Sequence, residues 1–222
     1  MLVGDFHVHT TASSDGLIRP SELVETAEDR GLSVLAVCDH GTLDGALEAR
    51  AHSEARGGRV LIIVGEEIAT LEGEIIGYFL ERPICPGLSV EETIEEIERQ
   101  NGVVCVPHPF DRLRRSPLAT SALERVALRV GLVEAFNARS LVKEDNARAR
   151  DWAQARGVPT TAGSDAHWSR EIGNVQVALP EFGDPTGFLA ALQKSAVSAR
   201  SSGIVPHVMT AWTKRVRGRS RG

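Results

Sequence analysis

The chain has 222 residues, of which 42% are hydrophobic and 25% charged, as is typical of a folded globular protein with one domain or two small ones. Its formal net charge of −5 argues against a general nucleic-acid-binding surface, and no apolar run approaches the roughly 18 residues that a membrane span needs. With no leader pattern at the amino terminus and three cysteines outside any Cys-x-x-Cys pair, we expect a cytoplasmic protein with reduced thiols.

Strand and helix signals alternate along the chain, with short connections between them. The apolar runs predict strands over 2–8, 33–38, 60–64, 103–106, 132–136, 159–162 and 174–179, with an extra extended piece over 74–80 beside the third. Helices are predicted over 20–30, 43–56, 89–100, 118–130, 142–156 and 188–196. Ser89 and Glu92 form the pattern of a capping box at the start of the third helix.

This alternation is typical of a parallel sheet, which can be an open doubly wound sheet or a closed barrel. Polar residues able to bind metal follow six different strands, and only in a barrel do all strand carboxyl ends surround one cavity. These residues are His9, His40, Glu67, His108, Asn137 and Asp165, with His167 close behind. We therefore predict an α/β fold, a single-domain (β/α)7 distorted TIM-like barrel over residues 1–200, followed by a basic C-terminal tail over 201–222.

The first predicted strand carries a His-x-His pattern, which is typical of a metal site. Alternation along a strand should point Asp5, His7 and His9 to one face, and Phe6 and Val8 to the other. Two imidazoles that converge in this way form a metal chelate readily, although a lone His-x-His is as often only the polar end of a strand.

Five motifs in the same order resemble the PHP (polymerase and histidinol phosphatase) superfamily of metal-dependent phosphoesterases over about residues 3 to 180. The matching segments are Asp5-Phe6-His7-Val8-His9 with Ser14-Asp15-Gly16, Cys38-Asp39-His40, Gly65-Glu66-Glu67, Pro107-His108-Pro109 and Gly163-Ser164-Asp165-Ala166-His167. The resemblance implies two or three divalent ions, which could be zinc, manganese or iron. It also favours Glu67 over Glu66 as the ligand, and strand alternation agrees that only one of the two can point inward.

The resemblance distributes the ligands over three ions. It implies that His7, His9, Glu67 and Asp165 hold the first ion, that Glu67 and His108 hold the second, and that Asp15, His40 and His167 hold the third. Many members add a His or Cys after the fifth strand, where this chain has Asn137. An amide oxygen is a weaker ligand, so we expect weaker binding of the second ion.

Other residues near the strand ends are candidates for proton transfer and substrate binding. Asp39, His40 and His167 are the candidate catalytic residues, and Asp5 is expected to orient a ligand imidazole. Arg112, Arg114, Arg115 and Arg139 could bind a phosphate, and we take Arg112, Arg115 and Arg139 as the substrate-binding candidates. Solvated loop charges are the alternative for each of them.

The expected activity is hydrolysis of a phosphate ester, because divalent ions lower the pKa of bound water to about 7 and a cationic centre attracts anions. The substrate would be a small phosphomonoester or phosphodiester, including a nucleotide or short oligonucleotide. The alternatives are a monoesterase that resembles histidinol phosphatase, or a metal-binding PHP domain without catalysis. No membrane association is expected, and the oligomeric state is left open.

Overall fold

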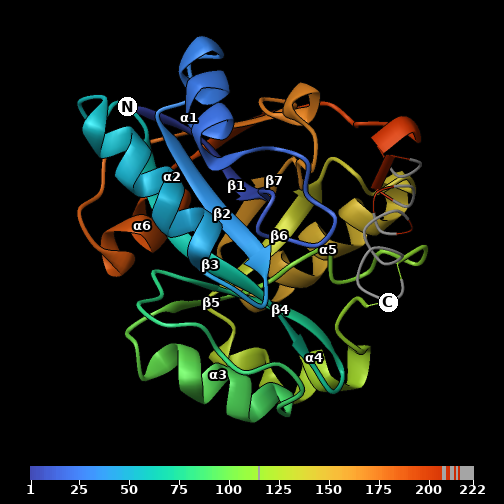
Figure 1. The fold of residues 1–222 in the computed structure, drawn as a ribbon. Helices are drawn as coiled ribbons and strands as arrows, with labels where there is room; N and C mark the ends of the chain where they lie inside the picture. The colour runs from blue at the N-terminus through green and yellow to red at the C-terminus, as the bar shows by residue number, and fades with distance from the viewer. Residues whose placement is uncertain (115, 207–208, 211–212, 214, 216–222) are drawn as a thin grey trace.

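The nine strands in the described part of the chain form one sheet, which curls into a nearly closed barrel with helices outside it (Figure 1). The computed structural model describes residues 1–114, 116–206, 209–210, 213 and 215. The strands are β1 (Leu2–Val8), β2 (Val34–His40), β3 (Leu61–Thr70), β4 (Gly73–Tyr78), β5 (Val103–Val106), β6 (Leu132–Asn137), β7 (Thr160–Gly163), β8 (Val175–Leu179) and β9 (Ala196–Ala199). The α-helices are α1 (Pro20–Asp29), α2 (Asp44–Ala55), α3 (Val90–Glu98), α4 (Thr120–Val126), α5 (Lys143–Arg156) and α6 (Pro185–Leu192).

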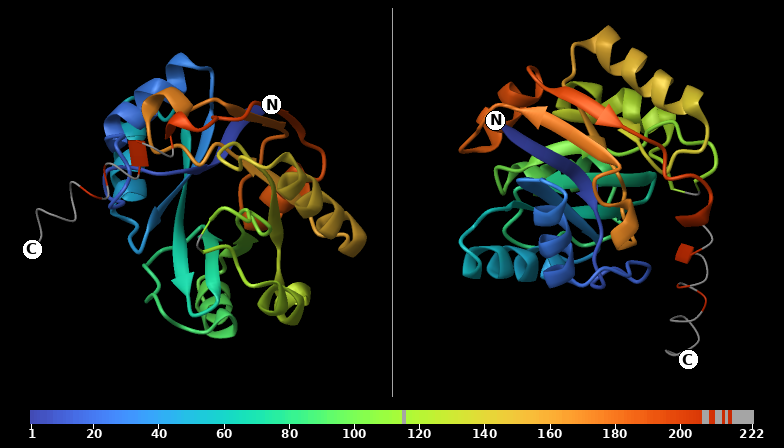
Figure 2. Two further views of the ribbon diagram at one scale, coloured as in Figure 1. Left: turned by 90° about the vertical axis from the view of Figure 1, so that its right-hand side faces the viewer. Right: turned by 90° about the horizontal axis from the view of Figure 1, so that it is seen from above.

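The strand order is β7-β6-β5-β4-β3-β2-β1-β8-β9. Backbone hydrogen bonds from Asp165 N to His7 O (2.8 Å) and from His9 N to Ala166 O (2.9 Å) join β1 to the segment after β7, which brings the sheet close to a complete barrel. The predicted α/β barrel fold is thus confirmed, and Figure 2 shows the helices distributed around the outside of the sheet.

The alternation of elements predicted a parallel sheet, but the observed sheet also contains antiparallel pairs of strands. Strands β1, β2 and β3 are parallel, as are β5, β6 and β7, but β4 pairs antiparallel with both β3 and β5, and β8 pairs antiparallel with β1. Only two residues connect β3 to β4, and so short a connection can join antiparallel strands but not parallel ones. The extended piece predicted beside the third strand is therefore the return arm of a hairpin.

Two apolar clusters fill the space on either side of the sheet. The inner cluster combines residues from β1 to β8 with Phe188 and Leu192 of α6, so this helix plugs one end of the barrel. The outer cluster packs the other faces of the strands against α1, α2, α3, α4 and α5. Phe188 lies against Phe6, with ring centroids 5.2 Å apart. With one end filled by apolar side chains, the opposite end, where the parallel strands finish, is left for polar ones.

A bulge in β1 overturns the simple alternation that we expected there. The pairing of β1 with β2 shifts register between Asp5 and Val8. As a result Phe6 belongs to the inner cluster and Val8 to the outer one, although strict alternation would place both on the same face. The bulge allows His7 to face the polar end of the barrel directly after Phe6 has packed into its core.

The predicted ends of several elements need correction. Helix α6 begins at Pro185, because the Asp184 carboxylate caps it by accepting a hydrogen bond from Gly187 N (2.7 Å), and 196–199 form the edge strand β9. The capping box of Ser89 and Glu92 is confirmed. No helix among the described residues is long and apolar enough to cross a membrane.

The predicted boundary of the barrel domain at residue 200 remains a prediction. Of the basic tail residues, Arg215 is described and exposed, whereas Lys214 and residues 216–222 lie outside the described part of the chain. Thr210 lies within the predicted tail and accepts a hydrogen bond from Arg139 Nη2 (2.6 Å). This part of the tail therefore contacts the barrel domain.

Candidate metal centre

Polar side chains from the ends of the strands converge at the end of the barrel opposite α6. Eight of the nine predicted metal ligands lie in one cluster, in which His40 is partly exposed and the others are buried: His7, His9, Asp15, His40, Glu67, His108, Asp165 and His167. They come from β1, β2 and β3 and from the loops after β1, β5 and β7. Because the carboxyl ends of these strands meet at one rim, residues as far apart in the chain as His7 and Asp165 contact one another.

The first group of donors surrounds the two imidazoles of the His-x-His pattern. His7 Nε2 and His9 Nε2 are 3.0 Å apart, and each lies 3.3 Å from Glu67 Oε2. Asp165 Oδ1 is 3.3 Å from His9 Nε2 and 3.8 Å from His7 Nε2. Two nitrogens and two carboxylate oxygens that face one point in this way form the donor set of a tetrahedral or octahedral metal site.

A second group lies beside it, where His167 Nε2 is 3.3 Å and His40 Nε2 is 3.9 Å from Asp15 Oδ2. The loop that carries Asp15 folds back tightly on itself: a Cβ on Gly16 would lie 1.8 Å from the backbone oxygen of Thr10. Glycine is therefore required next to Asp15 for the loop to bring this carboxylate to the two imidazoles.

A third group includes a residue that the sequence analysis missed. Donor atoms of Glu67, Glu74 and His108 all lie within 4.8 Å of one another, with His108 Nε2 3.0 Å from Glu67 Oε1 and 4.0 Å from Glu74 Oε2. Glu74 lies on β4, in register opposite Ala69 of β3. Its even spacing from the inward-facing Ile76 and Tyr78 was the available signal, but the antiparallel direction of β4 had to be known for it to be used.

A buried glutamate on β6, also missed, orients two of the imidazole-bearing segments. Glu134 Oε1 is 3.0 Å from His7 Nδ1, and Glu134 Oε2 accepts hydrogen bonds from His108 N (2.9 Å) and Asn137 Nδ2 (3.0 Å). A carboxylate at Nδ1 places the imidazole proton there and leaves Nε2 of His7 free to bind a metal. We had expected Asp5 in such a role, but Asp5 Oδ1 instead accepts a backbone hydrogen bond from Ser164 N (2.8 Å).

The Asp39 carboxylate forms its hydrogen bonds with residues outside the cluster of predicted metal ligands. Its Oδ1 accepts hydrogen bonds from Thr10 N (2.7 Å) and Ser13 Oγ (2.8 Å), and its Oδ2 accepts one from Thr10 Oγ1 (2.7 Å). Ser13 Oγ also lies 3.3 Å from His9 Nδ1. This carboxylate therefore fixes the loop between His9 and Asp15, whereas the side chain of His40 is 32% exposed.

Asn137 lies beside the cluster, and both the oxygen and the nitrogen of its side-chain amide form hydrogen bonds with other residues. Its Oδ1 accepts hydrogen bonds from Arg139 N (2.9 Å) and Arg114 Nη2 (3.3 Å), and its Nδ2 donates to Glu134 and to Asp165 Oδ2 (3.2 Å). These contacts favour a bridging role for the amide between carboxylates and arginines rather than a place among the metal ligands.

The candidate arginines are distributed differently from the sequence-based expectation. Arg112 points away and pairs with Asp145 on α5, with its side chain 61% exposed. Arg115 lies outside the described residues. Arg139 is buried, with Nη1 2.9 Å from His167 Nδ1 and Nε 3.2 Å from Glu171 Oε1. Arg114, which we had not chosen, is the arginine that contacts Asp165.

At His9 and Glu67, attraction between neighbouring groups outweighs the effect of burial on the pKa. Burial alone would lower the pKa of His9, but contacts with the Asp165 and Glu67 carboxylates raise it to about 9. Burial would likewise raise the pKa of Glu67, yet the neighbouring His7 and His40 hold it well below its usual range. In contrast, burial and the charge of Glu67 raise the pKa of Glu74 to about 8. A metal ion that binds these groups would displace the protons from its ligands.

The residues present fit divalent metal ions. Imidazole nitrogens and carboxylate oxygens of the cluster form three sets, each with its donor atoms within 4.8 Å of one another, and the buried Oδ1 of Asp165 has no hydrogen-bond partner among the described residues. Buried oxygen and nitrogen atoms left in this state are stabilised when a cation binds them.

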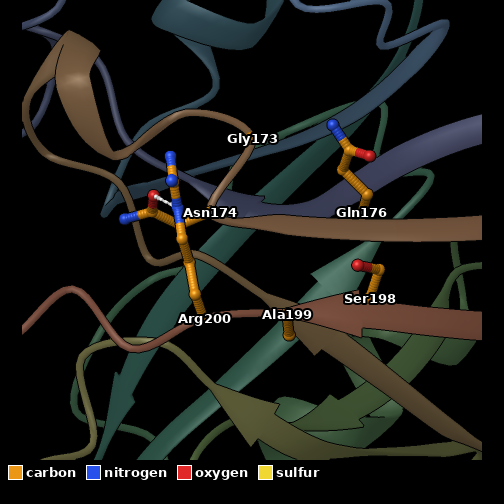
Figure 3. A pocket seen from close by; sticks show the side chains of 6 residues that line it. All are labelled: Gly173, Asn174, Gln176, Ser198, Ala199 and Arg200. Carbon is orange, nitrogen blue, oxygen red and sulfur yellow. Dashed lines mark hydrogen bonds between the residues drawn. The ribbon is translucent and has the colours of Figure 1, made fainter.

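A separate cleft of about 340 Å³ lies along β8 and β9 (Figure 3). It is lined by Gly173, Asn174, Gln176, Ser198, Ala199 and Arg200. Its lining has no carboxylate, imidazole or thiol, and Arg200 Nε is used in a hydrogen bond to Asn174 Oδ1 (2.7 Å). This cleft therefore lacks the donors of a metal centre.

Two known protein families match this chain. The PHP domain family matches residues 5–125, and the PHP-associated family matches residues 143–197. An uncharacterized protein of Methanocaldococcus jannaschii is 36% identical over 180 residues, which are 80% of this chain and 70% of that protein. The 5'-3' exoribonuclease Rnm of Escherichia coli is 34% identical over 104 residues, which are 45% of this chain and 34% of that enzyme.

Among solved structures, a two-domain protein from Bacteroides vulgatus that contains a predicted PHP-like metal-dependent phosphoesterase has the same fold. Its TM-score is 0.72 at 19% identity, and the superposition covers 90% of this chain and 65% of that one. Because the PHP domain match alone extends over more than half of the residues, the chain belongs to the PHP domain family.

Proposed function

We propose that this protein is a metal-dependent hydrolase of phosphate esters. The observation that carries the proposal is the convergence of five imidazoles on the two carboxylates of Glu67 and Asp165, all within hydrogen-bond or ion-pair distance: those of His7, His9, His40, His108 and His167. A structural metal site needs only four ligands and is usually closed, whereas this centre has ligands in excess and a partly exposed His40 at its edge. Its membership of the PHP domain family and its similarity to the Bacteroides vulgatus protein, which contains a predicted PHP-like metal-dependent phosphoesterase, support the same activity.

The ligands we propose are those predicted from the sequence, without Asn137 and with Glu74 added. His7, His9, Asp15, His40, Glu67, His108, Asp165 and His167 would hold two or three ions, and Glu74 would join Glu67 and His108. The bound ions would activate water and neutralise phosphate charge. Glu134 fixes the orientation of His7, and Asp39 holds the loop of Asp15 in place. In a centre of two ions that leaves His40 unligated, this most exposed imidazole of the cluster is the residue best placed to give a proton to a leaving oxygen.

We favour a small phosphorylated substrate, including a nucleotide or the end of a short oligonucleotide. The relative that acts on RNA supports the nucleic-acid option, since 104 residues of this chain match it at 34% identity. The acidic overall charge limits attraction of long polyanions to the vicinity of the centre itself.

The proposal is tested by hydrolysis of paired synthetic esters. We expect metal-dependent turnover of p-nitrophenyl phosphate or bis-p-nitrophenyl phosphate by protein loaded with manganese, zinc or iron, and the preferred ester separates a monoesterase from a diesterase. Nucleotides and short 5'-phosphorylated RNA then define the substrate class. Stoichiometric metal binding without turnover of any ester would instead favour a metal-binding domain without catalysis.

The ligands of the second ion can be distinguished by counting ions. The second ion would bind the group formed by Glu67, Glu74 and His108. We expect Glu74→Gln to lose one bound ion per chain, because a neutral amide replaces a carboxylate of this group. Asn137→Ala should keep the full count, because the Asn137 oxygen is occupied by Arg114 and Arg139. Plasma mass spectrometry of the desalted protein gives the count, with Glu72→Gln, a surface partner of Arg125, as the matched control. Loss of an ion from Asn137→Ala but not from Glu74→Gln would reverse the assignment.

A further inference from the structure

The loop after β5 presents one arginine to the metal centre and holds it there by a buried aspartate. Asp111 N bonds to His108 O (3.1 Å), so the loop turns back directly after the imidazole. Asp111 is buried, and its Oδ2 accepts hydrogen bonds from Arg114 Nε (3.3 Å) and from Ser140 Oγ (3.0 Å). The Nε edge of the guanidinium is therefore fixed to the protein, and its other edge faces the centre.

That other edge bonds to groups at the centre itself. Arg114 Nη2 contacts Asp165 Oδ2 and lies 3.3 Å from Asn137 Oδ1. The opposite oxygen of the same carboxylate, Asp165 Oδ1, faces His7 and His9. A fixed positive charge thus lies on one side of Asp165, and the donor group of the first ion lies on the other.

The guanidinium is neither fully buried nor fully used. The side chain of Arg114 is 20% exposed, and Nη1 has no hydrogen-bond partner among the described residues. A structural arginine as close to a buried carboxylate would be expected to use all of its guanidinium nitrogens in contacts with protein acceptors. A guanidinium that is held at Nε and Nη2 and can still donate from Nη1 is suited to bind a phosphate oxygen.

We propose that Arg114 is the phosphate-binding cation of this centre, and that it competes with metal for the charge of Asp165 when no substrate is bound. This inference rests on the proposed function and adds the residue that grips the phosphate. Removal of the Arg114 guanidinium should therefore change phosphate affinity and metal affinity in opposite directions. Removal of the guanidinium weakens phosphate binding, because a charge-assisted hydrogen bond is lost. Removal also strengthens metal binding, because a cation no longer neutralises a metal ligand.

The experiment measures both affinities on folded protein. Binding of inorganic phosphate to the manganese-loaded protein is measured by calorimetry, and binding of Mn²⁺ is measured separately without phosphate. For Arg114→Met we expect phosphate to bind about tenfold to a hundredfold more weakly. We expect Mn²⁺ to bind several-fold more tightly. Arg114→Lys, which keeps the charge but loses the fork, should fall between Arg114→Met and the wild type for phosphate.

Arg112→Met is the matched control, because this neighbouring arginine pairs with Asp145 outside the cluster and should change neither affinity. Unchanged phosphate binding in Arg114→Met would overturn the inference, and so would weaker binding of phosphate and Mn²⁺ together, which would indicate a structural role. If the wild type binds phosphate through Arg114 but hydrolyses no ester, the proposed function fails and this inference stands. If esters are hydrolysed and Arg114→Met matches the wild type in KM and kcat, only this inference fails.

Discussion

Asp165→Asn should lower ester turnover about a thousandfold, because a bound metal supplies several kcal/mol of transition-state stabilisation and each 1.36 kcal/mol is a factor of ten. Asp165 contacts the donor groups of His7, His9 and His167 at once, so no other carboxylate can replace its charge. The substitution keeps the shape of the side chain. It also suits the backbone, since Asp165 has a φ of +53° and Asn adopts this left-handed conformation readily.

The measurement is kcat/KM with the preferred ester, together with the bound-metal count. Asp184→Asn is the matched control, because Asn caps a helix as well as Asp and this residue only caps α6. An Asp165→Asn protein that is folded by circular dichroism and still turns over within tenfold of the wild type would contradict the placement of Asp165 among the ligands.

Glu134→Gln should weaken metal binding about tenfold to a hundredfold, although Glu134 would not itself touch the metal. The amide group of Gln cannot accept at both ends, so it loses either the contact with His7 Nδ1 or the hydrogen bonds from His108 N and Asn137 Nδ2. Leaving one of these buried donors unpaired should also cost about 1–3 kcal/mol of folding free energy.

Metal titration and thermal unfolding measure the two effects separately. Glu66→Gln is the matched control: Glu66 is also a buried glutamate, but it accepts a hydrogen bond from Ile84 N (2.9 Å) on the other face of the sheet. We expect Glu66→Gln to keep the metal affinity of the wild type. Equal affinities for Glu134→Gln and the wild type would show that Glu134 does not orient His7.

The sequence by itself determined the order of the elements and the residue types of the centre. Apolar runs that end in His, Asp or Glu were visible because a strand buried on both faces must be apolar until it reaches the rim of the barrel. The carboxyl ends of parallel strands meet at that rim, so His9, Glu67 and Asp165 could be grouped without coordinates.

Only the tertiary structure decided which side chains support that centre. Glu74 reaches it because β4 runs antiparallel between β3 and β5, and Glu134 reaches it because β6 lies beside β7 near His7. Arg114 rather than Arg112 faces Asp165, because Asp111 fixes the turn of their loop. Such contacts depend on strand direction, on a bulge and on loop conformation. These features arise from packing and hydrogen bonds between distant segments, which the local pattern of residues does not specify.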